Sequence, residues 1–214
     1  MMIQITLPDG SIQQVESGIT AAQLAAKISQ RLGKEALAVK FDGVARDLST
    51  PLTQDCAVEL MTFSSEGGAE IYRHSASHLM AQAVKQLFPE AKVAIGPAVD
   101  DGFYYDFDID HPFTPEDLEK IERKMAELVK ADTPFVRHEV TKDDAIRFFS
   151  ERGEQYKVEI LRDLPDGERI SQYQQGDFVD LCRGPHVPST GKIKAFKLLT
   201  IAGAYWRGDE RNKM

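Results

Sequence analysis

Cysteine is scarce in this sequence, because Cys56 and Cys182 are the only two among 214 residues. Two thiols so far apart do not form the disulfide framework of a small secreted domain. The first residues lack the basic segment and apolar block of a signal peptide, and no stretch reaches the roughly 18 apolar residues of a transmembrane helix. We therefore expect a cytoplasmic protein with reduced thiols and no membrane partner.

Basic residues are outnumbered, with 26 Lys and Arg against 34 Asp and Glu, which gives a formal net charge of −8. An acidic net charge argues against a protein that binds nucleic acid non-specifically, although it does not exclude a local basic patch. Hydrophobic residues make up 42% of the chain, more than disordered proteins have. At roughly 150 residues per domain, the length predicts one or two globular domains.

Residues 1–63 predict a small domain of the β-grasp, ubiquitin-like class. Ile3 and Ile5 alternate with polar residues, as in a half-buried strand, and Pro8-Asp9-Gly10 is typical of a hairpin turn. Thr20 begins a capping box that opens a helix, which we expect Gly33 to end. The expected order is strands at 3–7 and 12–15, a helix at 20–32, and strands at 36–41 and 57–62.

A small, polar linker at 64–68 separates this unit from a second domain, which we place at 69–214. The second domain mixes helical and strand patterns, so its expected class is α+β. Thr114-Pro115 is a strong helix start, with a cap followed by proline at the first helical position. Helices are expected to begin near 70, 115 and 142, and strands at 136–140, 158–161, 170–173 and 193–206.

His74 and His78 are four residues apart on the first of these helices, so both imidazoles lie on one face, about 6 Å apart. The apolar stripe of that helix centres about 200° from His74, which points both rings away from the main hydrophobic contact. For such a pair in isolation, two exposed surface histidines are the better interpretation. The pair alone is a weak signal of function.

Cys182 and His186 flank a bend at Gly184-Pro185, which can turn the thiol and the imidazole to the same side. The alternative is a structural turn with a buried thiol. Together with the histidine pair, the set offers three imidazoles and a thiolate, which suit tetrahedral zinc. The same groups could instead line a metal-free pocket that positions a water. A third and least favoured reading is nucleophilic catalysis by Cys182.

Lys157 and the pair Tyr104-Tyr105 are ambiguous when taken alone. Lys157 stands near an expected strand start, where a single lysine is usually a solvated surface residue. Tyr104 and Tyr105 are adjacent, so on a strand they would point to opposite faces. We expect one of them in the core and the other as a possible pocket hydroxyl.

Two segments are highly specific, Cys182-Arg183-Gly184-Pro185-His186 and Ala204-Tyr205-Trp206-Arg207-Gly208, and Arg73–His78 is less so. With the segments at 94–97, 102–106 and 152–157, they resemble the N-terminal region of bacterial-type threonyl-tRNA synthetases over essentially the whole chain. Ser77 departs from that pattern, where a small apolar residue is more usual.

The resemblance implies a β-grasp (TGS-type) domain followed by an editing domain that hydrolyses serine mistakenly attached to threonine tRNA. Serine is threonine without one methyl group, and a pocket gains only about 1–3 kcal/mol from such a group, so a second, hydrolytic site is needed. Alanyl-tRNA synthetases share this domain, and there the His-x3-His and Cys-x3-His pattern binds zinc.

The resemblance also implies roles for individual residues. His74 and Lys157 would hold and activate the water that attacks the ester. Asp180 would hold the amino group of the substrate, and Tyr105 would help to fix the terminal adenosine or the water. The pocket wall would be formed by His78, Cys182 and His186. In the threonyl enzymes the site is expected to work without zinc, so we expect neither a metal nor a cofactor.

The expected partner is the 3′ end of tRNA(Thr) carrying serine. We find no class II aminoacylation core in the sequence, so this chain should not charge tRNA, and we expect a full-length enzyme to dimerise through domains absent here. Two other functions remain open. One is a zinc-dependent hydrolase of another small ester, and the other is a non-catalytic RNA-binding module, since β-grasp domains often only bind.

Overall fold

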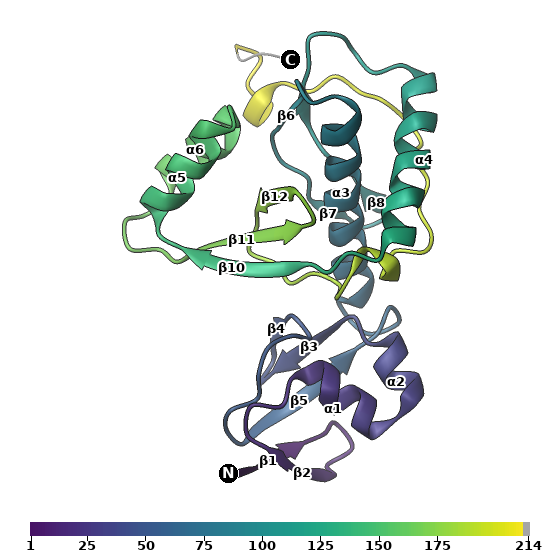
Figure 1. Cartoon of the computed structure of the whole chain (residues 1–214), viewed down its shortest axis with the longest axis vertical. Coiled ribbons are helices and arrows are strands. Elements are labelled where there is room, and N and C mark those ends of the chain that lie inside the picture. The colour runs from purple at the N-terminus through teal and green to yellow at the C-terminus, as the bar shows by residue number, and fades with distance from the viewer. Residues whose placement is uncertain (212–214) are drawn as a thin grey trace.

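A computed structural model describes residues 1–211, so residues 212–214 of the expected second domain lie outside the described residues. The chain forms two lobes stacked along the long axis (Figure 1). The first lobe contains β1 (Met2–Thr6), β2 (Ile12–Glu16), α1 (Ala21–Ile28), α2 (Gln30–Glu35), β3 (Ala38–Phe41), β4 (Val44–Arg46) and β5 (Cys56–Met61). Within residues 1–211, none of the helices combines the length and apolarity that a membrane span requires.

The second lobe begins with α3 (Gly68–Leu87) and continues with four short strands, β6 (Lys92–Val93), β7 (Ala98–Val99), β8 (Gly102–Phe103) and β9 (Phe107–Asp108). It ends with α4 (Pro115–Ala131), β10 (Val136–Val140), α5 (Lys142–Glu151), α6 (Gln155–Asp163), β11 (Ile170–Gln175), β12 (Phe178–Leu181), and the 3-10 turns η1 (Thr190–Lys192) and η2 (Trp206–Gly208).

The first lobe is a five-stranded sheet in the order β2-β1-β5-β3-β4, with β1 and β5 parallel. Leu24 of α1 packs into a buried cluster with Ile3 and Ile5 of β1, so the alternation of the first strand buries the expected face. This is the arrangement of a β-grasp domain. The expected single helix is wrong, because Ser29 is extended and its side chain caps a separate α2 that contains Gly33. Strand β4 was not predicted.

The second lobe is built around α3 (Figure 1). Strands β10, β11 and β12 form an antiparallel sheet, and α4 packs beside α3. Helices α5 and α6 pack against each other, and Figure 1 shows the pair on the opposite side of the lobe from α4. Helices and strands thus mix without regular alternation, as expected for an α+β domain.

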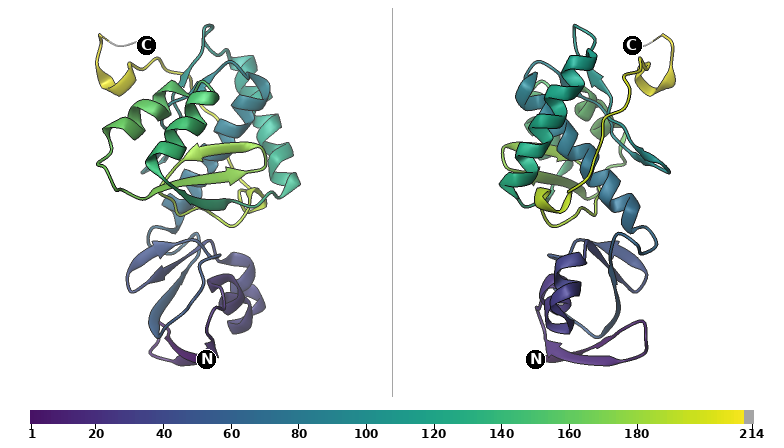
Figure 2. Two further views of the ribbon diagram at one scale, coloured as in Figure 1. Left: turned by 60° about the vertical axis from the view of Figure 1, so that its left-hand side comes forward. Right: turned by 90° about the vertical axis from the view of Figure 1, so that its right-hand side faces the viewer.

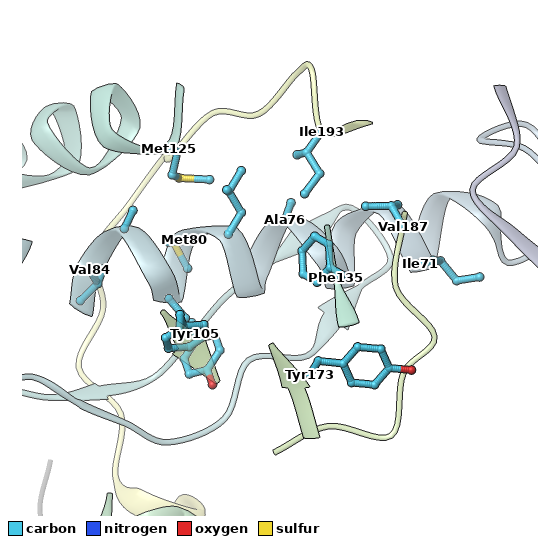
Figure 3. Close-up of a cluster of buried hydrophobic side chains, with 14 of the residues drawn as sticks. Ile71, Ala76, Met80, Val84, Tyr105, Met125, Phe135, Tyr173, Val187 and Ile193 are labelled. Atoms are coloured by element: carbon cyan, nitrogen blue, oxygen red, sulfur yellow. The ribbon is translucent and has the colours of Figure 1, made fainter. Parts of the chain in front are cut away.

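Helix α3 is buried on all sides over its middle turns. All ten residues from 75 to 84 are buried, which no surface helix with a single apolar stripe would show. Figure 3 shows the reason, because Met125 and Ile193 lie on one side of the helix and Tyr105 and Tyr173 on the other. The polar side chains of these turns are therefore held inside the lobe together with the apolar ones.

Two strand predictions in the second lobe are wrong. Residues 158–161 belong to α6, and most of 193–206 is an extended segment outside any sheet. Tyr72 holds that segment, since its hydroxyl donates to Ala195 O at 3.1 Å and accepts from Ala195 N at 2.9 Å. Glu122 of α4 accepts a further hydrogen bond from Leu198 N at 2.7 Å. The segment runs along the α4 side of the lobe (Figure 2, right).

The two lobes share buried contacts at their junction. Leu37 and Met61 of the first lobe belong to the same buried cluster as Ile71 of α3. Gly68, expected in the linker, is the first residue of α3. The division into domains at 1–63 and 69–214 with a linker at 64–68 stays a prediction. Buried side chains from both lobes pack together across the proposed linker.

Candidate functional site

A pocket of about 480 Å³ opens between α3, α6 and the strands β11 and β12. Six of the seven predicted site residues line it: His74, His78, Tyr105, Lys157, Asp180 and Cys182. The seventh, His186, lies directly behind Cys182 and is buried. The structure therefore brings together all seven residues, which come from distant parts of the sequence.

The thiol of Cys182 lies between two imidazoles. Its Sγ is 3.0 Å from Nε2 of His74 and 3.3 Å from Nε2 of His186. The ring of His74 stacks on that of His186 at a centroid distance of 4.6 Å, and the ring of His78 lies 4.4 Å from His186. The expectation that His74 and His78 are exposed surface residues is wrong, since His78 is only 3% exposed and His74 is half-buried at the pocket.

The turn between Cys182 and His186 depends on glycine. Gly184 has φ +71°, and its N–H donates to the Cys182 thiol at 3.2 Å. A Cβ at this position would lie 1.9 Å from the hydroxyl of Tyr173, so a side chain has no room here. The expected bend is thus present and turns the thiol and the imidazole to the same side.

Hydrogen bonds assign the protons of this cluster. Ser75 donates its hydroxyl proton to Ile71 O at 2.8 Å, so its oxygen can only accept from Nδ1 of His186 at 3.1 Å. His186 then carries its proton on Nδ1, and its Nε2 accepts from the thiol of Cys182. The thiol in turn accepts from Nε2 of His74, which leaves the lone pair of His74 on Nδ1.

Burial keeps every member of this chain neutral. Desolvation raises the pKa of the Cys182 thiol to about 12, so the sulfur keeps its proton at neutral pH. Desolvation also lowers the pKa of His74, and it lowers the pKa of His78 and His186 well below the usual range for histidine. A protonated thiol is a poor nucleophile, whereas a neutral His74 can accept a proton.

A second buried network lies beside the first. Lys157 of α6 is 3% exposed and pairs with Asp180 at 2.6 Å, so it is neither at a strand start nor on the surface. Tyr105 donates to the other carboxylate oxygen of Asp180 at 2.5 Å and accepts from Lys157 at 3.0 Å. Burial and the nearby carboxylate of Asp180 raise the pKa of Tyr105 well above its usual value, so the phenol remains a donor.

The carboxylate of Asp180 is already well supplied with donors. Its Oδ1 accepts from Lys157 and from Leu181 N at 2.8 Å, and its Oδ2 accepts from Tyr105. Nδ1 of His78 lies 3.3 Å from Oδ2, but the geometry does not allow a hydrogen bond between them. A substrate ammonium that reached Asp180 would have to take the place of one of these donors. Lys157 has three N–H groups and uses two here, so one remains to reach into the pocket.

Sequence reasoning missed the residues that support the site. Ser75 fixes the tautomer of His186, and Ser77 lies 2.7 Å from Gly96 O and 2.8 Å from His74 O, which ties α3 to the loop at the pocket mouth. Gly96 packs so closely on Tyr105 that an added Cβ would lie 2.0 Å from the ring. The position of Ser77 stood out only as a departure from the family pattern, and nothing local marked Ser75.

Comparison with known proteins finds two families that match parts of the chain. The family described as the TGS domain matches residues 3–62, and the family described as the threonyl and alanyl tRNA synthetase second additional domain matches residues 170–214. The chain carries a TGS domain followed by a second additional domain. The predicted β-grasp class and the predicted relationship are therefore confirmed.

Relatives of the whole chain are bacterial threonine–tRNA ligases. The chain is 57% identical over 213 residues to that of Acetivibrio thermocellus, covering 100% of this chain and 34% of the relative. It is 60% identical over 212 residues to that of a Geobacter species, covering 99% and 33%, and 55% identical over 212 residues to that of Symbiobacterium thermophilum, covering 99% and 33%. The chain thus spans about a third of these relatives and corresponds to their N-terminal region.

The second lobe contains a donor set that fits a metal ion. One ligand atom each from His74, His78, Cys182 and His186 lies within 4.8 Å of the others, and three imidazoles with one thiolate suit tetrahedral zinc. Ser75 accepts from Nδ1 of His186, as outer partners of metal-bound histidines usually do. A zinc ion held there would polarise a bound water or carbonyl. The prediction that no metal is used stays a prediction.

The buried histidines predict how stability of the metal-free protein depends on pH. Because the pKa values of His78 and His186 are lowered on folding, the unfolded chain binds more protons than the folded one below about pH 6.5. The free energy of unfolding is therefore highest above that pH. It decreases as the pH falls, with a slope approaching about 1.4 kcal/mol per pH unit for each histidine. Urea unfolding between pH 7 and pH 5 with chelator present measures this slope, and a flat profile would contradict it.

Proposed function

We propose that the second additional domain hydrolyses the ester bond of seryl-tRNA(Thr) and spares threonyl-tRNA(Thr). The observation that carries this proposal is the pairing, in one pocket, of a neutral His74 with a buried Lys157–Asp180–Tyr105 network. The likeness to threonine–tRNA ligases supports tRNA(Thr) as the partner.

The residues support hydrolysis by an activated water. The lone pair on Nδ1 of His74 takes a proton from the water while the remaining N–H of Lys157 orients its oxygen. The water oxygen bonds to the ester carbon, and the tetrahedral intermediate collapses as the carbon–oxygen bond to the terminal ribose breaks. The ribose oxygen takes the proton from His74, and serine leaves as the free amino acid.

The size and rigidity of the pocket support the choice of substrate. A volume of about 480 Å³ lies in the range of small-molecule sites and exceeds what serine alone needs, so the terminal adenosine can enter with it. The wall made by His78 and Cys182, with His186 behind them, is held by ring contacts and hydrogen bonds, and both imidazoles in it are buried. Forcing one extra methyl against such a wall costs typically about 1–3 kcal/mol. We propose that this cost excludes threonine.

The test is to incubate the protein with seryl-tRNA(Thr) and with threonyl-tRNA(Thr) and to follow the release of each amino acid. Release of serine well above the rate without protein, with threonine retained on its tRNA, is the expected result. Equal release of both amino acids would contradict the proposed selectivity. No hydrolysis together with tight tRNA binding would replace the proposal with a binding module.

The four-ligand cluster favours one alternative, a zinc-dependent hydrolase of another small ester. Elemental analysis of the purified protein and assays with and without a chelator distinguish the metal-free deacylase from the zinc-dependent hydrolase. For the proposed metal-free deacylase we expect zinc far below one ion per chain and an unchanged rate in chelator. Stoichiometric zinc with activity lost to chelator would establish the alternative.

A further inference from the structure

Asp47 of the TGS domain reaches into the second additional domain. It follows β4, and its Oδ1 accepts a hydrogen bond from the backbone N–H of His186 at 2.9 Å. Its Oδ2 accepts from the hydroxyl of Tyr173 at 2.7 Å. One carboxylate from the first lobe thus holds two groups of the second lobe, and one of them belongs to the cluster around the thiol.

Of the two groups that Asp47 holds, one is the backbone N–H of His186, and the other belongs to Tyr173, which is in contact with the ring of His186. Tyr173 is 1% exposed, and its ring packs edge-on against the imidazole at a centroid distance of 4.5 Å. The hydroxyl of Tyr173 also lies under Gly184, at the centre of the Cys-x3-His turn. The carboxylate therefore fixes the turn from its backbone and from the aromatic ring beneath it.

The position of His186 decides the protonation pattern of the cluster. Its Nε2 accepts the thiol proton of Cys182, and only then does the thiol accept from Nε2 of His74. If His186 shifts, the thiol loses its acceptor and can turn its proton toward His74. That would move the proton of His74 to Nδ1, the nitrogen that must accept a proton from water.

We propose that Asp47 is a positioning residue for hydrolysis, so that the TGS domain completes the site of the second additional domain. The proposal rests on the proposed function above, and it assigns to the TGS domain a task in the same reaction. Asp47 does not touch the pocket and acts through His186.

The first experiment compares three variants in seryl-tRNA(Thr) hydrolysis. Asp47→Ala removes both hydrogen bonds, and we expect the single-turnover rate to fall by about 10- to 100-fold, as for a small misplacement of a reacting group. Asp47→Asn keeps an oxygen for His186 N and gains an N–H for Tyr173, so we expect it to stay within about threefold of the parent. Asp55→Ala is the matched control, because Asp55 accepts from Gln4 N inside the TGS domain.

The second experiment does not depend on activity. Nitrogen-15 chemical shifts of the imidazoles report which ring nitrogen carries the proton, and exposed His138 serves as an internal control. We expect His74 protonated on Nε2 in the parent, Asp47→Asn and Asp55→Ala proteins, and a mixture of both forms in Asp47→Ala. If Asp47→Ala is too unstable to study, Tyr173→Phe removes one of the two hydrogen bonds and should show the same change in smaller degree.

Three results would overturn the proposal. One is an Asp47→Ala protein with unchanged rate and unchanged imidazole shifts. Another is an equal loss of rate in Asp47→Ala and Asp55→Ala, which would mean that only the stability of the TGS domain matters. The third is an equal loss in Asp47→Asn and Asp47→Ala. If the parent protein hydrolyses no seryl-tRNA, the proposed function fails, and the imidazole shifts alone then decide whether Asp47 orders the cluster.

Discussion

Replacing His74 with alanine is expected to slow the release of serine from seryl-tRNA(Thr) by about 100- to 10,000-fold, the usual contribution of a general base. The reason is that His74 offers the basic nitrogen of the thiol–imidazole chain, while the Lys157–Asp180 pair stays in place to hold the water. Single-turnover hydrolysis with the enzyme in excess measures the effect on the chemical step.

The control for this variant is His138→Ala, which removes an imidazole from the exposed strand β10. We expect it to hydrolyse seryl-tRNA(Thr) like the parent protein. Urea unfolding should show that His74→Ala remains folded, because His74 is only half-buried at the pocket wall. A folded His74→Ala protein with the parent rate would remove His74 from the proposed role.

Replacing Lys157 with methionine is expected to lower the free energy of unfolding by about 3–5 kcal/mol, as when one partner of a buried ion pair is removed. Lys157 and Asp180 are both almost fully buried, so the variant leaves a carboxylate without its counter-charge inside the lobe. Urea unfolding at pH 7 measures the loss, and hydrolysis should fall as well because Lys157 orients the water.

Two comparisons show whether the buried charge causes this loss. The double variant Lys157→Met with Asp180→Asn has neither charge, and we expect it to regain a large part of the lost stability. Lys120→Met breaks a pair with Asp117 in which the lysine side chain is about half exposed, and it should cost no more than about 1 kcal/mol. A Lys157→Met protein as stable as the parent would show that the pair does not stabilise the lobe.

Local signals in the sequence were sufficient for most of the first lobe and for the helix starts of the second. The capping box at Thr20 and the cap at Thr114 are both present, and each opens a helix at the predicted start. Strands β1 and β10 lie where alternation places them. These features are encoded within a few residues, so no knowledge of distant contacts is needed to predict them.

Segments whose structure depends on distant contacts were misread. Residues 158–161 form a short apolar run that suits a strand as well as a helix, and the packing of α6 against α5 decides for the helix. Residues 193–206 contain apolar residues at strand-like spacing, yet they are held by side chains of Tyr72 and Glu122 and not by a sheet. Neither partner can be found from the segment itself.

The site was predictable in its members but not in its environment. Helical spacing placed His74 and His78 together, and Gly184 predicted the bend, but the apolar stripe of α3 suggested that the rings face solvent. An apolar stripe predicts one buried side of a helix, whereas α3 is enclosed by α4 on one side and by Tyr105 and Tyr173 on the other (Figure 3). The role of Asp47 depends on a contact between two lobes, which no local pattern contains.

The dense packing around α3 restricts where this pocket can change. Its histidine wall backs onto ten consecutive buried residues, so enlarging the cavity from that side would disturb the core. Ile160 and Leu164 line the pocket from α6 and its end, are half-buried, and have side chains that no polar network requires. A protein engineer who wished to retarget the domain toward bulkier aminoacyl esters should begin with a library at these two positions, and natural divergence in specificity should concentrate there as well.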